Sequence, residues 1–363
     1  MSFKKRAAIG QPKLPAGTRL SPHNAQLLTS TGVPSLDDIL GGGLPIGTLL
    51  LIKQDKYTGY GNLLLKYFLA QGMVNGHHVA TVTEKSEEIL ASLPGLATKE
   101  GDRVEDKEKE EKMSIAWRYE RMKKFETSVS QSSQSQQREH LQVYCETFDL
   151  TKKLPLGEFP CEQYTQMHRE DFKDHPELLE RLSEMVREGG FSSLIPLPTG
   201  KERNVLRIGI QSLASPCWQP QTPHELYKFF HALRGLLRFS FASCVITFPS
   251  YLYSPSFVRR IEYMADAVIE LESFAPHTSL SSPSDYHGFL YVHRLPVLNS
   301  LVPSSAKLSV LTQGGNNNLG FKLRRKKFTV ETFHLPPEGG VSERRVPTEE
   351  QKGVLGKKDA LDF

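Results

Sequence analysis

The sequence predicts an α/β fold with a predominantly parallel central sheet flanked by helices. Apolar segments of strand length alternate with segments of helical periodicity, the order typical of α/β proteins. Several predicted strands are apolar at every position, as in strands that helices cover on both faces. The 363 residues allow one large domain or two smaller ones, and because the alternation runs throughout the chain, we expect one.

The predicted domain occupies residues 21–337 and follows a basic arm, residues 1–20, that is rich in Gly and Pro and expected to be disordered. It opens with a short helix at 35–40, where Ser35 can cap the helix and Asp38 can complete a capping box. A run of three glycines ends this helix. The next predicted elements are a buried strand at 48–52, a helix at 62–73 and a buried strand at 78–83. This strand–helix–strand order implies a right-handed parallel crossover.

An insert of different composition interrupts the domain at about residues 99–139. It holds a charged run, an aromatic segment around Trp117 and a Ser/Gln-rich run. We expect its charged and Ser/Gln-rich parts to be disordered and its aromatic part to dock on the domain or on a partner. After the insert, the pattern predicts strands at 141–150, 205–213, 244–248, 267–271 and 288–294 and helices at 177–187 and 224–239. Residues 319–335 alternate like an edge β-hairpin near the C-terminus, and residues 338–363 predict a disordered charged tail.

Composition excludes several classes of protein. The net charge of +4 is too small by itself to indicate nucleic-acid binding. The four cysteines form no C-x-x-C pair and the twelve histidines are dispersed, so we expect neither a metal site nor a disulfide framework. No apolar run approaches the length of a membrane span and the N-terminus lacks a signal peptide, so we expect an intracellular protein with no membrane partner.

The segment between the first buried strand and the next helix resembles a phosphate-binding loop without its phosphate-binding residues. A working P-loop reads G-x-x-x-x-G-K-[ST], with the Lys on the outer phosphates and the hydroxyl on the metal ion. Here Gly61, Asn62 and Leu63 stand at the last three positions, Lys56 replaces the first Gly, and Gly59 lies between. Asn62 brings no charge and Leu63 cannot ligate magnesium. We therefore expect this degenerate loop to bind no nucleotide cofactor.

Two further positions test for a nucleotide site. In RecA-like ATPases an apolar strand ends in the Asp that helps to hold magnesium, and Gln211 occupies that position here. A neutral amide is a poorer ligand than a carboxylate for a hard divalent cation. Glu84 follows the predicted strand 78–83, where RecA-like enzymes place the Glu that activates water, so it is the catalytic candidate of the chain. The alternative is that Glu84 caps the following helix.

Basic residues are concentrated in two places. In the segment FKLRRKKF, strand periodicity places Lys322, Arg324 and Lys326 on one face, either as a stripe that contacts phosphates or as charges that guard an edge strand from aggregation. Arg259 and Arg260 follow a loop rich in Tyr, Ser and Pro. Such a loop suits single-stranded RNA and equally suits a subunit interface.

Four segments of the chain are similar to the family of the fourth Elongator subunit. They are TGVPSLDDILGGGLPIGTLLLIKQD, IAWRYERMKKFE, FKLRRKKFTVETFHLPPE and the terminal Ala-Leu-Asp-Phe. The resemblance covers most of the chain from about Pro12, apart from the Ser/Gln-rich run. It implies a RecA-like fold.

The resemblance also implies a function. Elongator modifies the wobble uridine (U34) of tRNA at C5 with carboxymethyl-type groups, and the chemistry belongs to another subunit. The fourth, fifth and sixth subunits form a hetero-hexameric RecA-like ring that binds tRNA and responds to ATP. This chain would then be a non-catalytic accessory subunit, in the cytoplasm and also in the nucleus, whose partners are the other two ring subunits, the catalytic subcomplex and tRNA. ATP would bind, if at all, at ring interfaces. The alternatives are a divergent RecA-class ATPase that uses Glu84 and a scaffold that contacts only protein.

Overall fold

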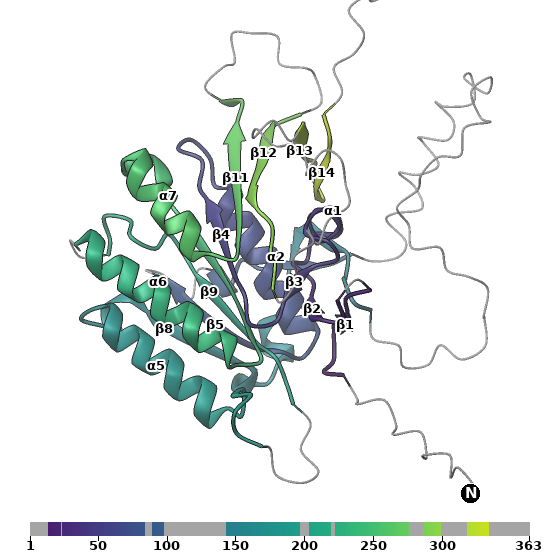
Figure 1. Ribbon diagram of the computed structural model, residues 1–363. Coiled ribbons are helices and arrows are strands. Elements are labelled where there is room, and N and C mark those ends of the chain that lie inside the picture. The colour runs from purple at the N-terminus through teal and green to yellow at the C-terminus, as the bar shows by residue number, and fades with distance from the viewer. Residues whose placement is uncertain are drawn as a thin grey trace, which may run out of the picture. The chain divides into compact units, whose positions relative to one another are not determined.

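A nine-stranded mixed sheet forms the centre of the fold (Figure 1), with the strand order β14-β13-β12-β11-β4-β10-β9-β5-β8. The six strands from β11 to β8 in this order are parallel to one another. They are β4 (Leu49–Lys53), β5 (His78–Thr83), β8 (Tyr164–His168), β9 (Leu206–Ile210), β10 (Ala242–Phe248) and β11 (Ala267–Ser273). Three antiparallel strands complete the sheet: β12 (Gly288–Arg294), β13 (Leu319–Leu323) and β14 (Phe328–Thr332). This is the mostly parallel, RecA-like α/β sheet that the sequence predicts, and β13 and β14 form the expected edge hairpin.

The computed structural model describes residues 14–22, 24–83, 89–97, 143–196, 203–218, 222–275, 286–298 and 318–333. Residues 1–13, the insert around Trp117, Glu84 and residues 334–363 lie outside the described residues. The predictions about residues 1–13, the insert and the tail therefore stay predictions. The end of the arm that was expected to be disordered is described and includes a strand, β1 (Thr18–Leu20), which pairs with β2 (Leu27–Thr29).

Helices cover both faces of the parallel strands, and each face has its own hydrophobic core (Figure 1). Helix α2 (Tyr60–Val74) packs on one face, where Leu50 and Ile52 of β4 point. Leu49 and Leu51 point to the opposite face, which α5 (His175–Glu188), α6 (Pro223–Arg238) and α7 (Pro255–Met264) cover. Because both faces of β4 are buried, its sequence is apolar at every position from Leu49 to Ile52 and does not alternate with polar residues. No helix in these described ranges is long and apolar enough to cross a membrane.

Two small sheets and several short turns accompany the main sheet. One sheet contains β1 (Thr18–Leu20), β2 (Leu27–Thr29) and β3 (Leu44–Pro45), and the other contains β6 (Pro94–Leu96) and β7 (Phe148–Lys153). The short 3-10 turns are η2 (Leu156–Glu158), η3 (Cys161–Gln163), η4 (Arg169–Asp171) and η5 (Ser250–Leu252). The strand predicted at 141–150 thus begins later, as β7, and lies outside the main sheet.

Helix α1 (Pro34–Ile39) is present, but the prediction that Ser35 caps it is wrong. Val33 occupies the cap position and makes no side-chain cap hydrogen bond. The Ser35 hydroxyl instead accepts a hydrogen bond from the backbone N–H of Val330 at 2.9 Å, which ties α1 to β14. A serine hydroxyl near the start of a helix can accept a hydrogen bond from a backbone N–H of the helix or from one of another segment. Here the N–H belongs to β14, the strand that packs against the helix.

Candidate functional site

The degenerate P-loop connects Lys53, the last residue of β4, to α2 at the carboxyl end of the parallel strands. Gly59 stands at the N-cap of α2 without a side-chain cap. The carboxylate of Asp55 accepts hydrogen bonds from the Tyr57 N–H at 3.1 Å and from the Thr58 hydroxyl at 2.8 Å. These two hydrogen bonds hold the loop around the carboxylate of Asp55. In a working P-loop the backbone N–H groups surround a phosphate instead.

Neutral side chains bind one another where a nucleotide site would hold its Lys. The Gln54 side-chain amide donates to Asn62 Oδ1 and to Ser212 Oγ, both at 3.0 Å. The hydroxyl of Thr247 donates to Asn62 Oδ1 at 3.3 Å and accepts from the Ser212 N–H at 2.7 Å. We call these four residues, Gln54, Asn62, Ser212 and Thr247, the neutral network.

The position of Gln211 agrees with its alignment to the magnesium-binding Asp. It directly follows β9 and precedes Ser212 of the neutral network, and its N–H donates to the Val82 carbonyl at 3.0 Å. The structure therefore brings Asn62 and the segment of Gln211 together. The interactions that join them are those of neutral groups, with no charge to attract a phosphate.

Lys53, the lysine that directly precedes the loop, is paired with carboxylates. Lys53 Nζ lies 3.0 Å from Glu262 Oε1 and 2.7 Å from Glu270 Oε2. Glu270 Oε2 lies 2.5 Å from His293 Nε2. Burial alone would raise the pKa of Glu270, but the hydrogen bonds from His293 and Lys53 outweigh it, so the pKa is lowered. Lys53 is thus engaged within the protein.

A groove of about 1130 Å³ opens beside the loop. It is lined by the residues after β4, by η5 and α7, and by parts of β11 and β12. Arg259 and Arg260 line it from α7, are exposed, and form no ion pair or side-chain hydrogen bond within the described part of the chain. Tyr251 and Tyr263 also line it, with 49 % and 69 % of their surface exposed. Four carboxylates, Asp55, Glu262, Glu270 and Glu272, also line the groove, and Glu262 and Glu270 of these pair with Lys53. The groove therefore combines two exposed arginines and two exposed aromatic rings with a lining of mixed charge.

The sequence analysis did not predict the helix that carries these arginines. Phe257, Val258 and Ile261 of α7 are buried against the sheet, so the helix turns Arg259 and Arg260 outward. The helix is only ten residues long and directly follows the loop rich in Ser, Pro and Tyr, so its first residues were assigned to that loop.

The basic hairpin differs from its prediction. Lys322 is buried, with Nζ 2.9 Å from Glu331 Oε2 and 4.3 Å from the centre of the Tyr286 ring. Arg324 and Lys326 lie in the turn between β13 and β14, where the Arg324 N–H donates to the Lys327 carbonyl at 2.9 Å. The prediction that the three side chains share one strand face is wrong, because the chain reverses direction at Arg324. Whether this turn contacts RNA is not tested.

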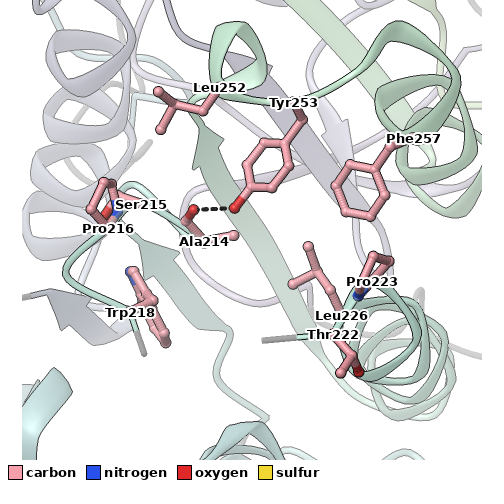
Figure 2. A pocket seen from close by; sticks show the side chains of 10 residues that line it. All are labelled: Ala214, Ser215, Pro216, Trp218, Thr222, Pro223, Leu226, Leu252, Tyr253 and Phe257. Atoms are coloured by element: carbon pink, nitrogen blue, oxygen red, sulfur yellow. Dashed lines mark hydrogen bonds between the residues drawn. The ribbon is translucent and has the colours of Figure 1, made fainter. Parts of the chain in front are cut away.

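A second hollow, of about 410 Å³, lies between the loops that follow β9 and β10 and the first turns of α6 and α7 (Figure 2). We call it the apolar slot. Its lining is Ala214, Ser215, Pro216, Trp218, Thr222, Pro223, Leu226, Leu252, Tyr253 and Phe257. The Tyr253 hydroxyl crosses it to donate to the Ala214 carbonyl at 2.5 Å. Ala214 has a φ of 64°, in the left-handed region that costs non-glycine residues energy, so this hydrogen bond helps to fix a strained loop.

Comparison with known proteins decides the family. Residues 11–363 match the PAXNEB protein family. The chain belongs to the PAXNEB family. Elongator complex protein 4 of Xenopus laevis is 38 % identical, with 93 % of this chain and 86 % of the relative covered. Elongator complex protein 4 of Homo sapiens is 37 % identical, with 89 % of this chain and 80 % of the relative covered. The protein of that name from Saccharomyces cerevisiae is 24 % identical, with 92 % of this chain and 79 % of the relative covered.

In this PAXNEB chain, sequence reasoning found part of the candidate site and missed part. The structure places Gly59, Gly61 and Asn62 at the start of α2 and Gln211 directly after β9, and their assignment to a degenerate nucleotide loop stays a prediction. The roles of Gln54 and Thr247 in the neutral network were missed, because nothing in a neutral residue's local sequence indicates a distant partner. Among the described residues, no group of three or more His, Cys, Asp or Glu side chains is placed to hold a metal ion.

The PAXNEB chain also contains a buried histidine behind the slot. The His175 ring stacks on Trp218 with centroids 5.8 Å apart and contacts Phe229 at 4.9 Å. Burial, followed by the charge of Arg169, lowers the pKa of His175 to about 4, although Glu225 and Asp174 oppose this. His175 is therefore neutral in the folded protein at neutral pH.

This lowered pKa predicts a loss of stability in acid. In the unfolded chain His175 is protonated below about pH 6.5, whereas in the folded protein it is protonated only below about pH 4. The free energy of unfolding therefore decreases as the pH falls from about 6.5 to about 4. Between pH 7.5 and pH 5 we expect His175 to cost about 2 kcal/mol. His175→Phe should remove that part of the loss in urea unfolding, whereas His224→Phe, at an exposed position of α6, should keep it. Equal acid losses for both variants would contradict the assignment.

Proposed function

We propose that this chain is a non-catalytic accessory subunit of the Elongator complex. In this proposal it joins the fifth and sixth subunits in a hetero-hexameric RecA-like ring that binds tRNA, in the cytoplasm and also in the nucleus. The ring supports the modification of wobble uridine U34 at C5, which the catalytic subcomplex performs. Relatives named Elongator complex protein 4 at 37–38 % identity, over most of their length, support membership of the complex.

The observation that carries the non-catalytic role is the neutral network. Asn62 Oδ1 accepts two hydrogen bonds, from Gln54 and from Thr247, so the side chain at the P-loop lysine position is engaged inside the protein. Hydrolysis of a nucleoside triphosphate depends on cations placed around the phosphates. At this loop, Lys53 is paired with two glutamates, Lys56 lies over the ring of Tyr57, and the side chains at the Lys, hydroxyl and Asp positions of a working site, Asn62, Leu63 and Gln211, are neutral. If ATP acts in the ring, residues of neighbouring subunits must supply the missing charge.

The groove supports the RNA part of the proposal. A phosphate backbone is attracted by cations that have no partner of their own, and unstacked bases stack on exposed aromatic rings. Arg259 and Arg260 provide such cations, and Tyr251 and Tyr263 provide such rings in the same groove. Buried Lys322, bonded to Glu331, lacks this freedom. We therefore propose the groove, rather than the hairpin stripe, as this chain's main contact with RNA.

Neutralising the two arginines tests this contact. In the ring assembled with its two partner subunits, Arg259→Gln with Arg260→Gln should weaken tRNA binding and flatten its dependence on salt. Two lost single-strand phosphate contacts reduce the slope of log K against log salt concentration by about 1.4. The measurement is a filter-binding titration over a series of salt concentrations, with and without ATP.

The matched control is Arg181→Gln with Arg187→Gln, which removes two exposed arginines from α5. This control should leave the slope unchanged, and a third variant with Arg324→Gln and Lys326→Gln tests the hairpin turn. An unchanged slope for the variant with Arg259→Gln and Arg260→Gln would show that the groove does not contact RNA phosphates. No tRNA binding by the intact ring would favour the protein-only scaffold, and ATP turnover by the isolated chain that is lost in Glu84→Gln would favour the divergent ATPase.

A further inference from the structure

The apolar slot adjoins the groove. Segment 250–253 lies between the two hollows, and Tyr253 lines both of them. On one side of this segment Tyr251 and Arg259 line the groove, and on the other Leu252 and Phe257 line the slot. A polymer that lies in the groove can therefore place a side group into the slot without leaving the surface.

The lining of the slot matches the chemistry of a nucleobase. A base has two flat aromatic faces and a polar edge, so it needs apolar or aromatic walls together with a few hydrogen-bonding groups. Trp218, Tyr253 and Phe257 provide aromatic surface (Figure 2). The hydroxyl-bearing residues Ser215 and Thr222 also line the slot. The Thr222 hydroxyl caps α6 by accepting from the Glu225 N–H at 3.3 Å, and no hydrogen bond within the described residues engages the Ser215 hydroxyl.

We propose that the slot receives one unstacked base of the single-stranded RNA whose phosphates lie against Arg259 and Arg260. This inference rests on the RNA-binding part of the proposed function and adds to it a base-binding site. The groove is also lined by the carboxylates Asp55, Glu262, Glu270 and Glu272, two of which pair with Lys53. The two exposed arginines beside them favour RNA over an apolar segment of a partner protein as the occupant. Of the cations of the groove, Arg259 and Arg260 have no carboxylate partner within the described ranges, and Lys56 lies over the ring of Tyr57. Duplex RNA keeps its bases stacked and cannot fill the slot.

Trp218 gives a direct reporter of the slot. The chain has two tryptophans, so Trp117→Phe leaves Trp218 alone. We would label this variant with 5-fluorotryptophan, assemble it with unlabelled partner subunits, and record its single fluorine resonance. A short oligouridine RNA should shift the resonance, whereas a duplex RNA of equal length should not. An oligouridine that binds without moving the resonance would overturn the proposal.

A substitution that fills the slot gives the second measurement. Ser215→Phe should weaken oligouridine binding by roughly tenfold, the effect of one lost stacking contact, and should leave the salt slope unchanged. Ser193→Phe, at an exposed serine outside the slot, is the matched control and should bind normally. Thermal unfolding of both variants shows whether either change disturbs the fold. Normal binding by a folded Ser215→Phe variant would also overturn the proposal.

The slot and the proposed function fail in distinguishable ways. If the assembled ring binds no RNA, the proposed function fails, and the slot proposal fails with it. If RNA binds with the expected loss of slope in the Arg259 and Arg260 variant but the Trp218 resonance stays fixed, only the slot proposal fails. If that resonance shifts when the partner subunits are added and RNA causes no further change, the occupant is a partner polypeptide instead.

Discussion

Replacing Arg207 with alanine should lower the free energy of unfolding by about 3–5 kcal/mol, because it removes a buried cation from the groups that surround it. Arg207 lies on β9 and is fully buried. Its Nε donates to His77 Nδ1 at 2.9 Å, and its Nη1 donates to the carbonyl oxygens of Ser30 at 2.7 Å and Phe68 at 3.0 Å. Alanine would leave these acceptors buried without donors and would open a cavity.

The charges around Arg207 predict that a neutral residue at this position destabilises the fold. Burial, and then the charge of Arg207, lowers the pKa of His77 to about 3, so this histidine stays neutral and accepts the hydrogen bond. Burial raises the pKa of Asp37 to about 6, although hydrogen bonds from Ser30 and Thr31 and the charge of Arg207 oppose the rise. At neutral pH, Arg207 is therefore the cation that compensates the Asp37 carboxylate. Its loss would leave a buried charge alone.

Urea unfolding at pH 7.5 measures this prediction. Arg207→Met keeps most of the side-chain volume without the charge and should also be strongly destabilised, which separates electrostatics from cavity formation. Arg207→Lys keeps the charge but cannot match the three directed hydrogen bonds, so it should fall between wild type and alanine. A loss below about 1 kcal/mol in the methionine variant would contradict the electrostatic explanation.

Replacing Asp266 with alanine should lower the free energy of unfolding by about 3 kcal/mol, because one carboxylate fastens α6 to the start of β4. Asp266 Oδ1 accepts from Arg234 Nε at 3.0 Å and from Arg238 Nη2 at 2.5 Å. Its Oδ2 accepts from the Leu49 N–H at 3.0 Å. Asp266 is buried, while the two arginines reach solvent, so we place the cost at the lower end for a broken buried pair.

Two variants separate the components of this effect. Asp266→Asn can still accept from Leu49 but loses the charge, so it should recover part of the stability. Asp174→Ala is an ordinary aspartate change for comparison, since Asp174 only caps α5 by accepting from the Glu177 N–H at 3.0 Å, and it should cost about 1 kcal/mol. If urea unfolding gave equal losses for Asp266→Ala and Asp174→Ala, Asp266 would have no role beyond that of a surface cap.

Sequence patterns predicted the elements whose burial is regular. Strand β5 and strand β12 have the predicted bounds, and α6 differs by one residue at each end, because apolar runs and helical periodicity are properties of a few neighbouring residues. Strand β8 was missed, since it lies at the sheet edge and reads Tyr-Thr-Gln-Met-His, with little apolar character. An edge strand needs only one neighbour and little burial, so its sequence carries a weak signal.

The sequence alone determined the RecA-like α/β fold and the absence of a lysine, a hydroxyl and a carboxylate at the three nucleotide-binding positions, Asn62, Leu63 and Gln211. These conclusions need only residue identities and local patterns. The tertiary structure decided what those positions do instead: Gln54 meets Ser212, 158 residues away, and Thr247 meets Asn62, 185 residues away. It also exposed Arg259 and Arg260 and buried Lys322 against Glu331. Such pairings depend on the order and register of the strands, which bring distant residues together and which no local pattern records.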